Sequence, residues 1–153
     1  MSLGHRSHAR KTRYNASWDT EKPDGRVFDS MLEASVARDL DILYKSKKIH
    51  AVAAQVWFDL FGKNGSKICR HRPDFLVTCN DGTQKILEVK GEESADWRIK
   101  KALFEDNYPH LTYIVCKREN VNYGKLIDIP TSQPLQPSNY ASDVAQITQY
   151  LTK

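Results

Sequence analysis

The sequence predicts an α/β or α+β domain in which a mixed β-sheet is flanked by helices. Two observations lead to this class. Two segments carry apolar residues at helical spacing, and the segments around them alternate apolar and polar residues between turn sequences. The expected order is a helix, three or four strands, a second helix and a further strand. At 153 residues the chain is most simply one domain with one modest core.

The first helix is predicted to begin after Ser30. This residue is a good N-cap, and Glu33 lies three positions later, as in a capping box. Apolar residues then recur at helical spacing along the segment, at Leu32, Val36, Leu40 and Leu43.

Strands and turns are predicted after this helix. The segment 55–61 (QVWFDLF) alternates, and GKNG at 62–65 predicts a turn. The segment 72–91 (RPDFLVTCNDGTQKILEVKG) then predicts a hairpin whose turn is NDG at 80–82. Pro73 suits the beginning of a strand, where its missing N–H is tolerated.

The rest of the chain divides into further segments. A second helix is predicted over 94–108, and 111–117 (LTYIVCK) is typical of a buried strand. Residues 1–26 are polar and basic without periodicity, and we expect a flexible N-terminal arm there. Residues 27–129 form the predicted core, and 130–153 form a Pro/Ser-rich connector with a short C-terminal helix.

The composition limits the protein class. No apolar run approaches the roughly 20 residues of a membrane helix, and the N-terminus lacks the apolar stretch of a signal peptide, so we expect a cytoplasmic, intracellular protein. The net charge of +4 and the pI near 8.9 suit a phosphate backbone as partner. The three cysteines lack CxxC spacing, which disfavours a zinc site, and their odd number disfavours a disulfide framework.

Three charged residues stand in the predicted hairpin although strand interiors disfavour Asp, Glu and Lys. Asp74 begins one strand, and Glu88 and Lys90 end the other on one shared face. Two carboxylates that converge at one end of a sheet repel each other unless a cation lies between them, so we expect Mg²⁺ or Mn²⁺ there. Lys90, about 6–7 Å along the strand from Glu88, can orient water and stabilise charge on a phosphoryl oxygen. The set therefore predicts metal-assisted phosphodiester hydrolysis.

Each of these residues also has an ordinary structural interpretation. Glu88 and Lys90 can form a solvent-exposed pair worth a few tenths of a kcal/mol, and Pro73-Asp74 can simply begin a strand. Glu33 can be a further carboxylate of the site or only the reciprocal partner of the Ser30 cap. The order of these features in one short chain favours the catalytic interpretation.

Basic residues near this constellation are candidates for DNA contacts. We predict that phosphates are bound by the second helix, by the residues before Asp74 and by the N-terminal arm. These residues are Arg98, Lys100, Lys101, Arg70, Arg72, Arg10, Lys11 and Arg13. Gln55 is a further candidate for the site, whereas Trp57 and Trp97 stand in apolar patterns and are expected to pack in the core.

The order of helix-borne glutamate, Pro-Asp, Glu-x-Lys and basic helix resembles the PD-(D/E)xK nuclease superfamily. The resemblance implies a restriction-endonuclease-like core, with metal ligands at Asp74, Glu88, the Val89 carbonyl and Glu33, and a catalytic Lys90. The stretches SMLEASVARDLDILYKSKKI, RPDFLV and VKGEESADWRIKKALFEDNYPHL are also similar to phage Holliday-junction resolvases of the endonuclease I type. The S-x-x-E, PDF and EVK run is shared with nuclease subunits of Tn7-like transposons.

These resemblances imply a metal-dependent DNA endonuclease of phage or mobile-element type that acts on branched DNA as a homodimer. Two alternatives remain open: a transposon end-cleaving subunit that needs a transposase or recombination partner, and a non-catalytic nucleic-acid-binding module. The stretch between Asp74 and Glu88 is longer than expected for the resolvases, and no resemblance extends past Val121. Contacts at the hairpin tip therefore stay open.

Overall fold

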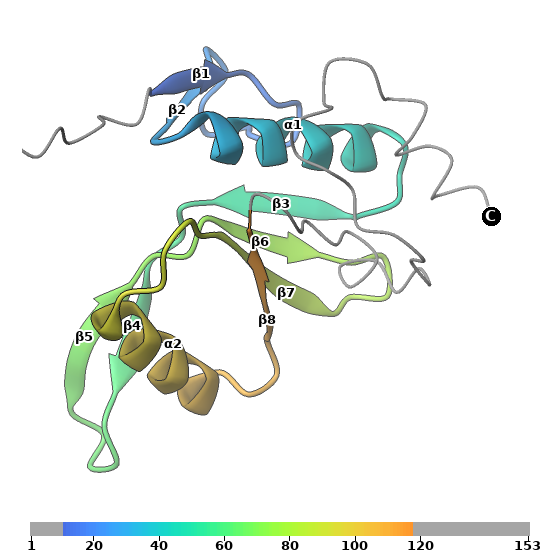
Figure 1. Cartoon of the computed structure of the whole chain (residues 1–153). Coiled ribbons are helices and arrows are strands. Elements are labelled where there is room, and N and C mark those ends of the chain that lie inside the picture. The colour runs from blue at the N-terminus through green and yellow to red at the C-terminus, as the bar shows by residue number, and fades with distance from the viewer. Residues whose placement is uncertain (1–10, 118–153) are drawn as a thin grey trace, which may run out of the picture.

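A mixed four-stranded sheet forms the centre of the computed structural model, which describes residues 11–117 (Figure 1). The strand order is β3-β6-β7-β8, in which β3, β6 and β7 are antiparallel and β8 is parallel to β7. The bounds are β3 Ala51–Ala54, β6 Phe75–Thr78, β7 Gln84–Val89 and β8 Thr112–Cys116. The predicted α/β class with a mixed sheet is confirmed.

Both predicted helices are present at the expected positions. Helix α1 spans Met31–Lys45, and the Ser30 hydroxyl accepts a hydrogen bond from the Glu33 N–H at 3.1 Å, as the capping pattern predicts. Helix α2 spans Ala95–Asn107 after its N-cap Ser94. Neither helix of the described residues is long and apolar enough to cross a membrane.

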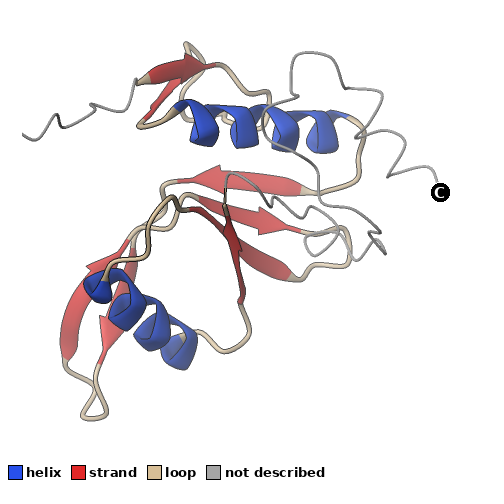
Figure 2. Cartoon of the chain, viewed as in Figure 1, coloured by secondary structure: helices blue, strands red, loops and turns tan. Residues whose placement is uncertain are grey.

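The helices cover opposite faces of the sheet, because alternate strand residues point to opposite sides. Phe75 and Val77 pack into the buried cluster that includes the apolar residues of α1. Leu76 and Ile86 contact the smaller cluster around Phe104 of α2. Figure 2 shows α1 on one side of the sheet, with α2 on the other beside a second strand pair.

That second pair is formed by β4 (Phe58–Phe61) and β5 (Lys67–His71). The sequence pattern predicted one strand over 55–61, but β4 begins only at Phe58, and the separate strand β3 was missed. Gln55 explains the break, since its φ of 56° lies in the left-handed region and cannot continue a strand. β3 has the sequence AVAA, in which Val52 is the only residue of the β-branched and aromatic types that make a strand recognisable.

The expected basic arm over 1–26 is wrong for its described part. Residues 12–28 include a two-stranded ribbon of β1 (Thr12–Tyr14) and β2 (Arg26–Phe28) that belongs to the core. Trp18 is buried and donates its indole N–H to the Ala37 carbonyl of α1 at 3.2 Å. The segment lacks a repeating apolar pattern because a few large residues, rather than an amphipathic element, dock it.

Two predicted segments lie outside the described residues. The first ten residues, with Arg10, are one of them. The other comprises 118–129 of the predicted core together with the connector and helix predicted over 130–153.

Candidate functional site

Asp74 and Glu88 lie opposite each other at one end of the sheet. The register of β6 and β7 pairs Phe75 with Leu87, so the next positions outward are Asp74 and Glu88. The Val89 N–H donates to Oδ2 of Asp74 at 2.7 Å, which ties the Asp74 carboxylate to the end of β7. The predicted convergence of the two carboxylates is therefore present.

Glu33 approaches the pair from the first turn of α1. Burial raises its pKa to about 7, and the negative charges of Asp74 and Asp29 act in the same direction. The Asp29 backbone N–H and the Ser30 hydroxyl oppose this rise. Glu33 thus combines both interpretations of the sequence: it belongs to the helix cap and it interacts with Asp74.

The environment of the pair disfavours negative charge. Burial, followed by the charge of Glu88, raises the pKa of Asp74 to about 7, although the Val89 N–H and Lys90 oppose the rise. Burial also raises the pKa of Glu88, against the hydrogen bond from Tyr113 and the charge of Lys90. Partly buried carboxylates that raise one another's pKa values form a site that a cation would stabilise.

Lys90 supplies positive charge beside the carboxylates. Its backbone N–H donates to the Cys116 carbonyl at 2.9 Å, which fixes the chain just beyond β7 and β8. Its ammonium lies 5.6 Å from the ring centroid of Trp97. The positive charge of Lys90 opposes the rise in the pKa values of Asp74 and Glu88, so the expected carboxylate–lysine grouping is present.

A hydrogen-bonded chain behind Glu88 was missed by the sequence analysis. The Tyr113 hydroxyl donates to Oε2 of Glu88 at 2.9 Å, and Nε2 of His71 lies 2.8 Å from that hydroxyl. Burial, together with Lys100 and Lys90, lowers the pKa of His71 to about 4, so His71 is neutral at pH 7. Because the Tyr113 hydroxyl donates its proton to Glu88, it accepts from the Nε2–H of His71. The 4.0 Å approach of the neutral His71 to Glu88 is not an ion pair.

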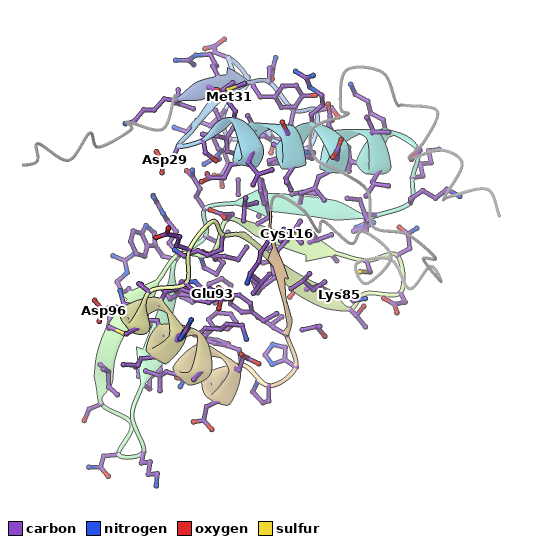
Figure 3. The ribbon with its side chains drawn as sticks, viewed as in Figure 1. Asp29, Met31, Lys85, Glu93, Asp96 and Cys116 are labelled. Atoms are coloured by element: carbon purple, nitrogen blue, oxygen red, sulfur yellow. The ribbon has the colours of Figure 1, made fainter. Side chains whose placement is uncertain are left out.

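The sequence offered no pattern that links these residues. His71 comes from β5, Tyr113 from β8 and Glu88 from β7, so only the tertiary structure brings them together. Asp29 was missed too, although it directly precedes the predicted cap. Figure 3 shows its side chain beside the start of α1, and its charge raises the pKa values of Glu33 and Asp74.

The two tryptophans expected in the core differ. Trp97 is 7% exposed, and its ring packs at 6.4 Å from that of Tyr113, as predicted. The prediction for Trp57 is wrong, because its side chain is 51% exposed. Trp57 lies just before β4, where the alternation of side chains turns it to the outer side of the β4–β5 strand pair. Arg70 and Arg72 lie over its ring.

Gln55 lies beside the site through its backbone. Its N–H donates to the Asp74 carbonyl at 2.9 Å, while its side-chain Oε1 is 3.4 Å from Nη1 of Arg26. Asp19 holds Arg26 by a buried ion pair of 2.7 Å. Gln55 therefore connects the N-terminal ribbon to the carboxylate end of the sheet.

Among the described candidate phosphate-binding residues, Lys101 is partly buried and the others are exposed. Arg98, Lys100 and Lys101 follow each other on the first turns of α2, where Arg98 approaches Glu93 at 3.7 Å and Lys101 pairs with Glu105. Lys11 is exposed, whereas Arg13 donates to the Gly25 carbonyl at 3.0 Å and so holds the β1–β2 ribbon. Their contacts with DNA stay a prediction.

The donor set suits a cation that keeps part of its water shell. Within residues 11–117, no group of three or more His, Cys, Asp or Glu side chains is arranged to hold a metal ion. Mg²⁺ is usually bound through one or two carboxylates together with waters and substrate phosphates. The pair Asp74 and Glu88, with the Val89 carbonyl and Glu33 nearby, fits that mode rather than a closed protein cage.

The fold and the site define an α/β protein that carries interacting carboxylates and a lysine at one end of its sheet. The chain belongs to the family described as "protein of unknown function (DUF1064)", which matches residues 11–122. The match begins with the N-terminal ribbon rather than at the predicted core boundary of residue 27. No curated protein matches the sequence significantly.

Proposed function

We propose that the protein is a divalent-metal-dependent DNA endonuclease that hydrolyses phosphodiester bonds. The observation that carries the proposal is the placement of Asp74 and Glu88 across one strand pair, with Lys90 two residues beyond Glu88 and Glu33 beside Asp74. Burial and mutual repulsion outweigh the hydrogen-bond donors of these three carboxyl groups and raise their pKa values, as is common at functional sites.

The residues have distinct roles in this proposal. Asp74 and Glu88 would hold Mg²⁺ or Mn²⁺, with the Val89 carbonyl as a further ligand and Glu33 in support. The cation, when bound, supplies Lewis acidity toward the scissile phosphate. Lys90 orients the attacking water and stabilises negative charge that develops on a phosphoryl oxygen. Tyr113 positions the Glu88 carboxylate, since its hydroxyl holds Oε2 at 2.9 Å.

The proposed fold relationship is a restriction-endonuclease-like core. Three features support it: a mixed sheet with a helix on each face, an acidic residue at the start of one strand, and Glu-x-Lys at the end of its antiparallel neighbour. Exposed basic residues on α2, beside the site, suit a substrate with a phosphate backbone. Because phosphate contacts carry no sequence information, we propose recognition of DNA structure, such as branches, by a homodimer.

Cleavage of synthetic DNA by the full chain tests the proposal. The substrates are a four-way junction, a linear duplex and a single strand, each with Mg²⁺, Mn²⁺ or EDTA. Lys90→Ala should abolish cleavage and leave DNA binding largely intact. Lys63→Ala is the matched control, because Lys63 is an exposed lysine in the turn between β4 and β5. It should cleave like the wild type.

Each outcome has a definite meaning. Metal-dependent, paired cuts in the junction alone support a resolvase, whereas equal cutting of the linear duplex keeps the nuclease and removes the branch specificity. Retained cleavage in Lys90→Ala would remove the role assigned to Lys90. Binding without cleavage of any substrate would favour a partner-dependent transposon subunit or a non-catalytic binding module.

A further inference from the structure

Trp57 presents an unusually placed aromatic surface. Its side chain is 51% exposed, although the other two tryptophans of the sequence, Trp18 and Trp97, are 5% and 7% exposed. The guanidinium of Arg70 lies 4.2 Å from the centroid of the Trp57 ring, and that of Arg72 lies 5.1 Å from it. An exposed indole flanked by two cations is not explained by packing, since neither arginine is buried.

The strand register connects this surface to the candidate catalytic end of the sheet. The pairs Ala54–Phe75 and Phe58–His71 are separated by three residues on each strand, so the register continues through the break. In that register Trp57 lies opposite Arg72, and Gln55 lies opposite Asp74. Arg72 and Asp74 lie two residues apart in the short segment that joins β5 to β6, so at most about 7 Å of chain separates them.

An acidic neighbour holds Arg70 beside the ring of Trp57. Asp59 pairs with Arg70 across β4 and β5, and its Oδ1 lies 3.7 Å from Nε of Arg70. Lys67 approaches the same carboxylate oxygen at 3.1 Å. Arg70 is thereby kept over the indole while its side chain stays 49% exposed.

A nucleotide combines the two properties that this surface recognises. Every base offers a flat π-face for stacking on an indole, and the adjoining phosphate is a strong charge-assisted partner for a guanidinium. When a phosphate draws an arginine off the ring, the indole face is left for the base. A paired base inside a duplex cannot reach such a ring, because both its faces are already stacked.

We infer that Trp57, Arg70 and Arg72 form a stacking platform for an unpaired base of single-stranded DNA. Building on the proposed function, this inference specifies that the nuclease engages an unpaired stretch next to the phosphate that it cuts. The separation between Arg72 and Asp74 lets one strand contact the platform and the carboxylate end together.

Intrinsic fluorescence tests the platform directly, because only one of the three tryptophans is substantially exposed. A single-stranded oligothymidylate is titrated into the full chain in EDTA, where no metal-dependent cleavage occurs. The fluorescence should be quenched, and the bound DNA should protect the protein against acrylamide quenching. Trp57→Phe should remove both effects, since Trp18 and Trp97 are buried.

Binding measurements on variants separate stacking from charge. Trp57→Ala should weaken binding of the single strand about tenfold and that of a duplex of equal length less than about twofold. Trp57→Phe should recover part of the loss, because it keeps a flat ring. Phe61→Ala is the matched control: Phe61 is a 41% exposed aromatic at the other end of β4, and its loss should change neither affinity.

The outcomes separate this inference from the proposed nuclease. Equal weakening of single strand and duplex, or no weakening of either, would overturn the platform even if the wild type cleaves DNA. Quenching through Trp57 in a protein that cleaves nothing would support the platform and overturn a nuclease that acts alone, in favour of a partner-dependent subunit or a binding module.

Discussion

The two faces of the central sheet are covered by different kinds of residues. The face toward α1 carries an extended apolar cluster whose members include Val36, Leu40, Phe75 and Val77, all at most 1% exposed. The face toward α2 has a smaller buried cluster of Leu60, Ile86, Phe104 and Leu111. Beside this smaller cluster lie His71, Glu88 and Tyr113 in their hydrogen-bonded chain.

The same contrast divides the buried carboxylates. Burial alone would raise the pKa of Asp41 on α1, but hydrogen bonds from Ser17, Tyr14 and Lys45 outweigh it and lower that pKa. At the end of the sheet, burial and the neighbouring Glu88 raise the pKa of Asp74 to about 7. The fold therefore stabilises the charged form of Asp41, whereas it destabilises the charged form of Asp74, as is common for functional acids.

The largest expected effect separates function from stability at Glu88. Glu88→Gln should lower metal-dependent cleavage by at least about 10²-fold, because it removes a charged ligand. In EDTA its melting temperature should be unchanged or higher, since a buried charge that repels Asp74 is lost. Cleavage kinetics and thermal unfolding measure the two effects.

Glu92→Gln is the control for Glu88→Gln, because Glu92 is an exposed carboxylate just beyond β7. It should change neither quantity. A fall of several degrees in the melting temperature of Glu88→Gln would instead assign Glu88 a structural role.

The next effect compares matched leucines on the two faces. Leu40 and Leu60 are both fully buried, the first in the cluster toward α1 and the second in the cluster toward α2. Leu40→Ala should lower the free energy of unfolding by about 3–4 kcal/mol, and Leu60→Ala by about 2–3 kcal/mol, because the smaller cluster can close more of the cavity. Urea unfolding gives both values, and the reverse order would break the comparison.

The sequence was informative where local rules determine the structure. Ser30 caps α1 as predicted, α2 begins within one residue of its predicted start, and the NDG turn sets the register that places Asp74 opposite Glu88. These features follow from hydrogen bonds or backbone preferences within a few residues, which a single sequence displays directly.

The sequence did not predict features that form by contacts between distant segments. Trp18 docks on α1 although no repeating pattern surrounds it, and the chain of His71, Tyr113 and Glu88 joins three strands. The exposure of Trp57 depends on the break at Gln55. The left-handed backbone of Gln55 could not be predicted from its residue type. Such features depend on tertiary packing, which overrides local propensity.

A smaller effect concerns the pH dependence of stability at Asp41. Its folded pKa is lowered below the unfolded value of about 3.9, so its contribution is present above that value and is lost as pH falls through the folded pKa. Asp41→Asn should therefore cost about 1–3 kcal/mol at pH 7 and progressively less below about pH 4. Urea unfolding at pH 7, 5 and 3 measures this; a constant difference at all three would contradict it.

The smallest expected effect tests whether Tyr113 acts through Glu88. Tyr113→Phe removes the hydroxyl that holds Oε2 of Glu88, so cleavage should fall about tenfold and the Mg²⁺ concentration for half-maximal rate should rise. The free energy of unfolding should change by only about 1 kcal/mol, because His71 is left without this acceptor.

Non-additivity distinguishes positioning from a general structural effect. In a Glu88→Gln background, Tyr113→Phe should cause little further loss of cleavage, since the carboxylate that it positions is already gone. An undiminished tenfold loss in the double variant would mean that Tyr113 acts independently of Glu88. The hydrogen-bonded chain of His71, Tyr113 and Glu88 would then contribute to packing and not to catalysis. The functional difference between the two faces would then rest only on the opposite pKa shifts of Asp41 and Asp74.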